Sequence, residues 1–281
     1  MEKIYIKQAG EIEAIRQGGT ILARILRELE GMVAPGVGTA VLEAYLVSGI
    51  EAAGGRPAFL GYPMGGNLAF PSALCASINE EVVHGTALPN RILVSGDIID
   101  LDIGMEWPVD PALRRKLALP TNPHSPRGGY YTDTCLTVGV GKIGRDLRRL
   151  LSVTEEALYA GIKQAKAGNS LADIGQAIQA TADHHGYGVV QDLVGHGVGY
   201  FAHEDPNVFN YAIPRRSREN IVLQEGMVIA IEPMFNLGGW AVAETDNGMT
   251  IVTADGSPSA HFEHTVAITK DGPSILTSYE R

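Results

Sequence analysis

The feature that most limits the possible folds of this chain is an internal repeat. The segment GDIIDLD ends at Asp102, and the similar segment GMVIAIE ends 130 residues later at Glu232. Asp133 and Glu263 are separated by the same 130 residues. Two stretches of helical periodicity precede these segments in each half. The repeat therefore predicts an α/β (α+β) chain in which two pseudo-symmetric helix-helix-strand halves pack face to face and send polar groups into one central site.

The spacing of apolar residues supplies the elements of each half. Apolar residues recur three to four positions apart in four stretches, which we expect to be helices, and short strand-like runs follow each helix pair. The predicted helices span residues 9–33, 40–53, 147–167 and 171–185, and the predicted strands span residues 73–78, 98–103, 135–140, 227–231, 249–252 and 265–268.

Residues 105–131 interrupt this order. The segment contains five prolines and a basic run at 114–116, and it has no strand or long helical periodicity. We therefore expect a single domain over residues 1–281 with an inserted Pro-rich loop at about 105–131. The loop has two interpretations. It is either a solvent-exposed connection or a flap or basic contact beside the cleft, since the candidate ligands Asp102 and Asp133 flank it.

Composition excludes several classes of protein. Hydrophobic residues make up 45% and charged residues 19% of the chain, a balance that is incompatible with wholesale disorder. The formal net charge of -10 opposes a chain-wide surface for nucleic acid or anionic membranes, so we expect neither as a partner. Two cysteines cannot form a disulfide framework. Because no apolar stretch is typical of a signal core or a membrane span, we expect a cytoplasmic protein.

Four carboxylates stand in or beside the strand-like runs: Asp102, Asp133, Glu232 and Glu263. Any one of them alone can be a capping or salt-bridged residue. Four together would repel one another strongly unless divalent cations neutralise them. Such an oxygen-rich set suits two bridged divalent ions, an arrangement used for hydrolysis. Asp100 lies on the same strand face as Asp102, and the repeat favours Asp102 as the ligand.

The histidines differ in their surroundings. His196 is flanked by glycines in GHGVG, which leaves room for an imidazole ligand, although a buried core histidine is the alternative. His84 and His203 have no ligand-like spacing to the carboxylates, so we expect them to form hydrogen bonds or handle protons. Four others are expected to be surface or structural residues: His124, His184, His185 and His261.

Six segments together resemble the type I methionine aminopeptidases, over nearly the whole chain. They are the runs at 75–85, 96–104, 195–199, 203–206, 231–234 and 262–265. The resemblance implies the pita-bread fold, a centre of two divalent ions of the Co, Mn, Fe or Zn type, and removal of the initiator methionine from nascent proteins, with a small second residue preferred. It also implies a monomer that meets the ribosome transiently.

The same resemblance assigns roles to residues. Asp102 would bind one ion, His196 and Glu232 the other, and Asp133 and Glu263 would bridge both. A water made acidic by the ions would attack the first peptide carbonyl, with Glu232 as the proton shuttle. The resemblance also implies residues that bind the substrate. His84 and His203 would contact the amide and the oxyanion. The methionine side chain would be surrounded by Phe59, Tyr62, Phe70 and Cys75. A simple buried apolar residue is the alternative for Cys75.

Departures from the family pattern concern the pocket and the insertion. Asp102 and Asp133 are 31 residues apart, farther than is usual, and the stretch 63–69 is also long. Ala202 and Met249 replace larger side chains that are common in the family.

Two rival hypotheses stay open. An aminopeptidase P or prolidase shares the ligand set and cuts before proline, but such proteins resemble this chain only in a C-terminal half. A catalytically silent pita-bread protein would bind RNA or ribosomes, for which the basic run at 114–116 is the candidate contact, but such proteins lack ligands that are present here.

Overall fold

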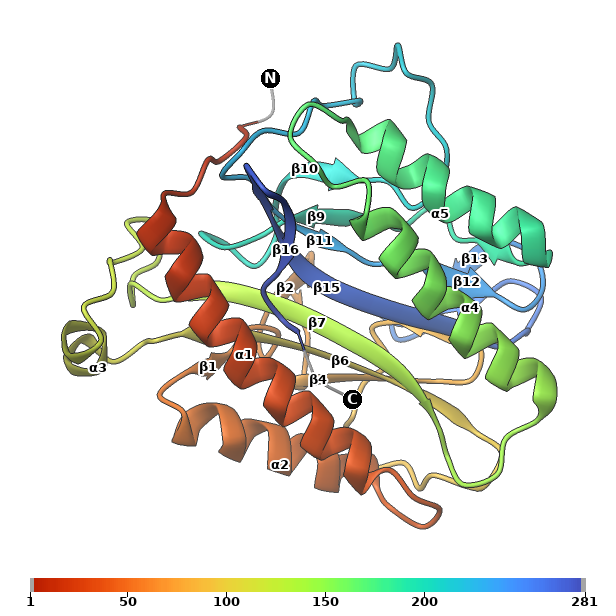
Figure 1. The fold of residues 1–281 in the computed structure, drawn as a ribbon. Helices are drawn as coiled ribbons and strands as arrows, with labels where there is room; N and C mark the ends of the chain where they lie inside the picture. The colour runs from red at the N-terminus through yellow and green to blue at the C-terminus, as the bar shows by residue number, and fades with distance from the viewer. Residues whose placement is uncertain (1–2, 279–281) are drawn as a thin grey trace.

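The computed structural model describes residues 3–278, in which helices pack on one face of a large antiparallel sheet (Figure 1). The helices are α1 (Ala9–Met32), α2 (Thr39–Ala52), α3 (Pro111–Lys116), α4 (Arg145–Ile162) and α5 (Leu171–His185). The strands of the large sheet are β1 (Arg56–Pro57), β4 (Leu74–Ile78), β6 (Ile98–Trp107), β7 (Tyr130–Gly139), β8 (Gly188–Val189), β9 (Gly195–Gly197), β10 (Glu204–Val208), β11 (Val228–Ile231), β12 (Met234–Asn236), β15 (Ser259–Thr269) and β16 (Gly272–Ile275). Its main path has the order β1-β6-β7-β15-β11-β9-β10.

Two small sheets lie beside the large one. One contains β13 (Val242–Glu244), β14 (Ile251–Thr253) and β5 (Glu81–Val83), and the other is the hairpin of β2 (Pro63–Gly65) and β3 (Leu68–Ala69). Both sheets carry residues close to the candidate site described below.

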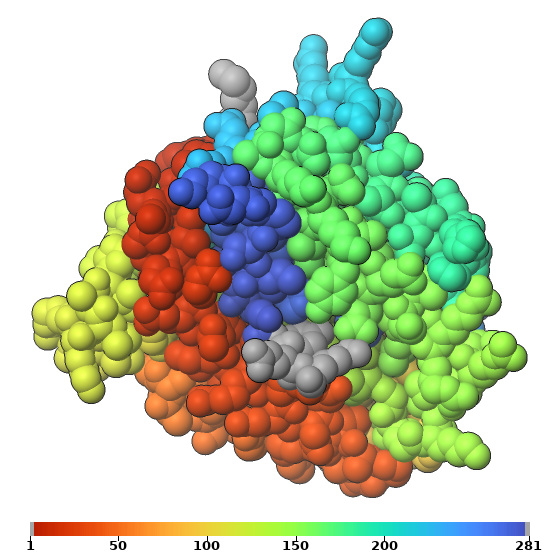
Figure 2. All heavy atoms as spheres, viewed as in Figure 1, coloured from red at the N-terminus to blue at the C-terminus, as the bar shows by residue number. Residues whose placement is uncertain are grey.

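The two halves have the same order of elements, which confirms the predicted fold class. In the first half α1 packs on β6 and β7 with α2 beside it, and in the second half α4 packs on β15 with α5 beside it (Figure 1). Strand β7 of the first half pairs with β15 of the second, so the sheet continues across the junction. On the helical face, β16 fills the space between α1 and α4 (Figure 2).

Threonine hydroxyls reinforce the junction between the halves. Thr134, Thr137 and Thr265 each donate a hydrogen bond to a backbone carbonyl of the opposite strand, at 2.7–2.9 Å. Each such bond contributes about 1 kcal/mol. The two strands that carry polar groups into the site are therefore held firmly in register.

The two faces of the sheet differ in polarity. Along β6, Ile99, Leu101 and Ile103 join the core beneath the helices. A fully buried side chain of this kind contributes about 1.5–3 kcal/mol. Because side chains alternate along a strand, the side chains of Asp100 and Asp102 point outward from the opposite face of the sheet. The face away from the helices is thus where polar chemistry can occur.

Helix ends agree with local sequence signals. Ser170 and Asp173 form a capping box at the start of α5, and Gly186 ends it with a left-handed φ of 79°. A cap of this kind contributes about 1 kcal/mol.

Among residues 3–278, no helix combines the length and the apolar character that crossing a membrane requires.

The insertion is shorter and more ordered than predicted. Strand β6 continues to Trp107 and β7 begins at Tyr130, because Met105 and Trp107 extend the apolar alternation into the core. Residues 108–129 connect the two strands and include α3, a helix that the sequence periodicity did not reveal.

The predicted basic run does not form one exposed cluster. Arg114 is buried and donates hydrogen bonds to the backbone carbonyls of Pro108 and Arg127, so it holds the insertion together. Arg115 and Lys116 face solvent. Only these two residues of the run are available to a partner.

Candidate metal centre and active site

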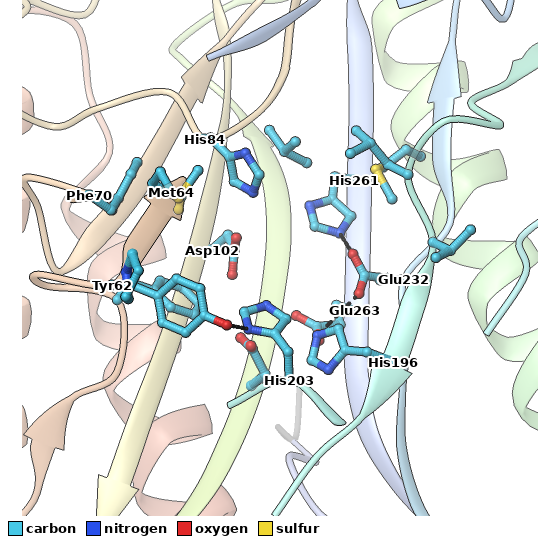
Figure 3. Close-up of a pocket in the computed structure, with 18 residues that line it drawn as sticks. Tyr62, Met64, Phe70, His84, Asp102, His196, His203, Glu232, His261 and Glu263 are labelled. Atoms are coloured by element: carbon cyan, nitrogen blue, oxygen red, sulfur yellow. Dashed lines mark hydrogen bonds and ion pairs between the residues drawn. The ribbon is translucent and has the colours of Figure 1, made fainter. Parts of the chain in front are cut away.

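A pocket of about 390 Å³ opens on the face of the sheet away from the helices. Carboxylates and imidazoles line one end and apolar side chains line the other (Figure 3). The lining includes every residue that the sequence analysis placed at the metal ions or the substrate: Phe59, Tyr62, Phe70, Cys75, His84, Asp102, Asp133, His196, His203, Glu232 and Glu263.

Strand register brings three of the carboxylates together. Asp102 of β6 and Glu263 of β15 both lie directly opposite Cys135 of β7. Asp133 precedes Cys135 by two residues, so its side chain points to the same face of the sheet. Carboxylate oxygens of Asp102, Asp133 and Glu263 all lie within 4.8 Å of one another.

A second cluster shares Glu263 with the first. His196, Glu232 and Glu263 also offer ligand atoms within 4.8 Å of one another. The Nε2 atom of His196 lies 3.4 Å from Oε1 of Glu232, which follows β11. A carboxylate common to two ligand sets is the arrangement that holds two neighbouring cations.

The buried carboxylates repel one another, and some of their oxygen atoms have no hydrogen-bond partner in the described part of the chain. Among residues 3–278, Asp102 Oδ1, Asp133 Oδ1 and Glu263 Oε1 are buried without a hydrogen-bond partner. Burial and repulsion from neighbouring carboxylates, Asp100 first, raise the pKa of Asp102 to about 8. Burial and the same repulsion raise the pKa values of Asp133 and Glu263 well above their usual range. Oxygen atoms in this state fit divalent metal ions, which would offset the repulsion.

His196 is positioned by the glycines on either side of it. A Cβ atom on Gly195 or Gly197 would lie 2.3–2.4 Å from a carbonyl oxygen of a neighbouring strand, so only glycine lets the strands approach this closely. The Nδ1 atom of His196 donates to the Gly197 carbonyl at 2.8 Å. This tautomer leaves the Nε2 lone pair facing Glu232 and available to an ion.

His84 has an unusual backbone conformation. Its φ of 58° lies in the left-handed region that residues other than glycine rarely adopt. Thr250 Oγ1 donates to the His84 carbonyl at 3.0 Å and holds this conformation. Burial lowers the pKa of His84, and its ring donates a hydrogen bond to the backbone of Met249. The other ring nitrogen is therefore left as a hydrogen-bond acceptor toward the pocket (Figure 3).

His203 lies at the pocket mouth, open to solvent on one side. Its Nδ1 is 2.8 Å from the Tyr62 hydroxyl. Burial raises the pKa of Tyr62, so this hydroxyl stays protonated and donates a hydrogen bond to Nδ1. Desolvation and the nearby His196 and His84 lower the pKa of His203, which keeps the ring neutral. Its Nε2–H is then a donor toward the pocket.

The apolar end of the pocket is a small cluster of its own. Phe59, Phe70 and Cys75 are buried together, and Tyr62 and Met64 pack against them. Gly104 makes room, since a Cβ atom there would lie 2.7 Å from the Phe59 ring. Burial, followed by repulsion from Asp102, raises the pKa of the Cys75 thiol well above its usual range, so Cys75 contributes an uncharged wall.

His261 was expected to be a surface or structural residue, and the structure excludes the surface position. His261 is 2% exposed and lines the pocket beside Glu232 (Figure 3), and its other ring nitrogen is bonded to Asp100. His261 precedes Glu263 by two residues on β15, so strand alternation could have placed both on the same face. The sequence analysis assigned no role to several other lining residues, which loops and short strands bring to the pocket: Met64, Val83, Leu193, Val194 and Met234.

Comparisons with known proteins agree with this arrangement. The model of metallopeptidase family M24 matches residues 13–109 and 125–270. A methionine aminopeptidase of Clostridium acetobutylicum is 42% identical over 277 residues, which cover 99% of this chain and 100% of that protein. The crystal structure of a Thermotoga maritima methionine aminopeptidase has a TM-score of 0.85 at 36% identity and covers 99% of this chain and 100% of its own.

A more distant structure shares the fold alone. The prolidase from Pyrococcus horikoshii OT3 has a TM-score of 0.72 at 22% identity, and the match covers 98% of this chain and 64% of the prolidase. The match to the family leaves out residues 110–124, which lie within the insertion. The likeness to the methionine aminopeptidase structure confirms the predicted pita-bread fold. By the extent of these matches, the chain belongs to metallopeptidase family M24.

Proposed function

We propose that this chain is a metal-dependent aminopeptidase that removes the initiator methionine from nascent proteins with a small second residue. One observation carries the proposal: two ligand clusters that share Glu263 meet an apolar pocket within a single cavity. The identity to curated methionine aminopeptidases over nearly the whole chain supports it.

Two divalent ions of the Co, Mn, Fe or Zn type fit the donor set. Asp102, Asp133 and Glu263 would hold one ion, and His196 and Glu232, with Glu263 again, would hold the other. When bound, the ions polarise the carbonyl and make a water acidic enough to act as a nucleophile at neutral pH.

The side chains around this centre then divide the remaining tasks. Glu232 accepts the proton of the attacking water and passes it to the leaving amine. The Nε2–H of His203 donates to the carbonyl oxygen as negative charge develops on it. The free nitrogen of His84 accepts the N–H of the scissile amide and so fixes its orientation.

The apolar end selects the side chain of the first residue. Phe59, Phe70 and Cys75 form a dry wall that suits an unbranched thioether and offers no partner to a charged group. A pocket of this kind separates methionine from close isosteres by only about 1–3 kcal/mol. We therefore expect strong rejection of charged first residues and weak rejection of isosteric ones.

The proposal is tested with metal-stripped protein retitrated with Mn²⁺, Co²⁺, Fe²⁺ or Zn²⁺. Free methionine, measured by chromatography, is expected to appear from Met-Ala-Ser with at least one of these metals, much less from Met-Phe-Ser, and Arg-Pro-Pro should stay intact. Cleavage of Arg-Pro-Pro instead would favour the prolidase hypothesis. A folded protein that binds these metals but releases no methionine would favour the binding-protein hypothesis.

We further propose that the insertion supports the loop that carries His203. Asn122, which is 1% exposed, donates hydrogen bonds to the carbonyls of Gly129 at 2.7 Å and Tyr200 at 2.9 Å. The ring of His124 lies against Tyr200, with ring centroids 4.9 Å apart. These contacts link residues 108–129 to the segment that leads into His203.

Replacing Asn122 with alanine is expected to lower kcat/KM for Met-Ala-Ser by about tenfold. The change leaves two carbonyls without their donor, a cost of about 1–3 kcal/mol that loosens the His203 loop. The matched control is the double variant Arg115→Ser/Lys116→Ser, which should keep full turnover of short peptides. If Asn122→Ala has no effect, the insertion is only a solvent-exposed connection. If the double variant is impaired, the exposed charges contribute instead.

A further inference from the structure

A buried line of polar side chains runs beside the metal centre. The Nδ1 atom of His261 is hydrogen-bonded to Oδ2 of Asp100 at 3.3 Å, and its Nε2 atom lies 3.5 Å from Oε2 of Glu232. Asp100 is 3% and His261 is 2% exposed. Within residues 3–278, His261 Nε2 has no hydrogen-bond partner, so its other nitrogen is engaged while this one is aimed at Glu232.

The backbone holds the His261 ring in this place. The backbone N–H of His261 donates to Oγ1 of Thr137 at 2.9 Å, and the Thr137 hydroxyl donates to the His261 carbonyl at 2.9 Å. Asp100 secures the ring from the other side, on β6. The ring is thus fixed by β6 and β7, whereas Glu232 follows β11 in the other half of the molecule.

Each oxygen of Glu232 faces a different imidazole. Oε1 lies 3.4 Å from His196 Nε2, and Oε2 lies 3.5 Å from His261 Nε2 (Figure 3). The terminal torsion of a glutamate is broad and has no strong preference of its own. A group on each oxygen therefore determines how the carboxylate plane is turned.

The arrangement has no counterpart in the other half. The positions 130 residues from Asp100 and His261 are occupied by Ala230 and Tyr131. The internal repeat therefore does not account for the pairing of Asp100 with His261. The pair is present only on the side of the site that holds Glu232.

We propose that His261, held by Asp100, is a positioning residue that orients the Glu232 carboxylate for ion binding and proton transfer. The inference rests on the proposed function, in which Glu232 is an ion ligand. Groups that orient a ligand in this way typically change metal affinity or activity by about 10- to 100-fold when they are replaced.

The test is Mn²⁺ binding to metal-free full-length protein, measured by calorimetry without any substrate. His261→Ala is expected to weaken binding of one ion by about 10- to 100-fold. His261→Gln keeps a donor near Glu232 and should recover part of the loss. In turnover of Met-Ala-Ser, kcat should fall while KM stays close to that of the wild type, because the apolar cluster around the methionine side chain does not include His261.

The matched control is His264→Gln on the same strand. His264 is 1% exposed, lies on the opposite face and contacts Thr277 and Tyr159, so it tests burial without contact to Glu232. Thermal unfolding of all variants checks that each of them is folded. Equal Mn²⁺ affinity in His261→Ala and His264→Gln would overturn the proposal, as would a rise in KM alone.

A third ion is the competing outcome. Asp100, Cys135 and His261 offer ligand atoms within 4.8 Å of one another. If wild-type protein binds three Mn²⁺ ions and His261→Ala binds two, these residues are a metal site and the positioning role is wrong. If wild-type protein binds Mn²⁺ but releases no methionine, the proposed function fails, while the effect of His261 on binding is still measured.

Discussion

Replacing Asp133 with asparagine is expected to reduce methionine release from Met-Ala-Ser by about 1,000-fold or more, a loss of about 4 kcal/mol of transition-state stabilisation. Asp133 belongs to the cluster with Asp102 and Glu263 and also to a cluster with His196 and His203. It therefore reaches both proposed ion positions. The amide keeps the size of the side chain and removes its charge, so the loss reports on ion binding and not on packing.

The same variant should be at least as stable as the wild type when no metal is present. Burial and repulsion from Asp102 and Glu232 raise the pKa of Asp133, and asparagine removes that repulsion. The matched control is Asp97→Asn. Asp97 accepts hydrogen bonds from Asn79 and from the Val94 backbone outside the pocket, so this variant should keep its activity. Near wild-type turnover in Asp133→Asn would contradict the assignment.

The metal-free protein is expected to lose stability as pH rises from about 4 to about 8. Asp102 has a pKa of about 8 in the folded chain against an ordinary value of 3.8. Between these values the folded state binds more protons than the unfolded state, so the free energy of unfolding decreases with increasing pH. The stability is fully present below pH 4 and is lost as pH passes the folded-state pKa. Asp133 and Glu263, whose pKa values are also raised, act in the same direction.

Divalent ions should reverse this loss. A metal present at 100 times its dissociation constant stabilises the folded state by about 2.7 kcal/mol, which raises Tm by several degrees for a chain of this size. Thermal unfolding of metal-free and Mn²⁺-loaded protein from pH 5 to pH 8 checks both effects. Asp133→Asn should show a shallower pH dependence and a smaller response to Mn²⁺. A metal-free wild-type protein that becomes more stable over this range would rule out the charge cluster.

Much of the fold follows from patterns that the sequence carries openly. The repeat aligns Asp102 with Glu232 and Asp133 with Glu263, and its helix-helix-strand order matches the two halves of the structure. These features are readable because strand alternation and helical periodicity are local rules. The choice of Asp102 over Asp100 also came from the repeat, and the structure places Asp102 in the carboxylate cluster while Asp100 binds His261.

Other parts depend on tertiary contacts that local rules do not contain. His261 was assigned without regard to its two-residue spacing from Glu263, and its pairing with Asp100 spans 161 positions. Arg114 lies in a basic run for which the sequence predicts exposure to solvent. In the structure it is buried, because it donates hydrogen bonds to backbone carbonyls of the folded insertion. Likewise, the contact of Asn122 with Tyr200 joins segments 78 positions apart, and no periodicity points to it.

The location of the ligands on long strands has a consequence for how this chain can change over evolution. A slip of one position between β15 and β7 would turn Glu263 toward the helices and bring Phe262 or His264 to the pocket side. Insertions and deletions in those strands are therefore intolerable. Tyr62, Met64 and His203 stand instead on loops and a short hairpin, where length can vary at little entropic cost. New substrate preferences can thus arise at the pocket walls while the hydrolytic chemistry stays the same.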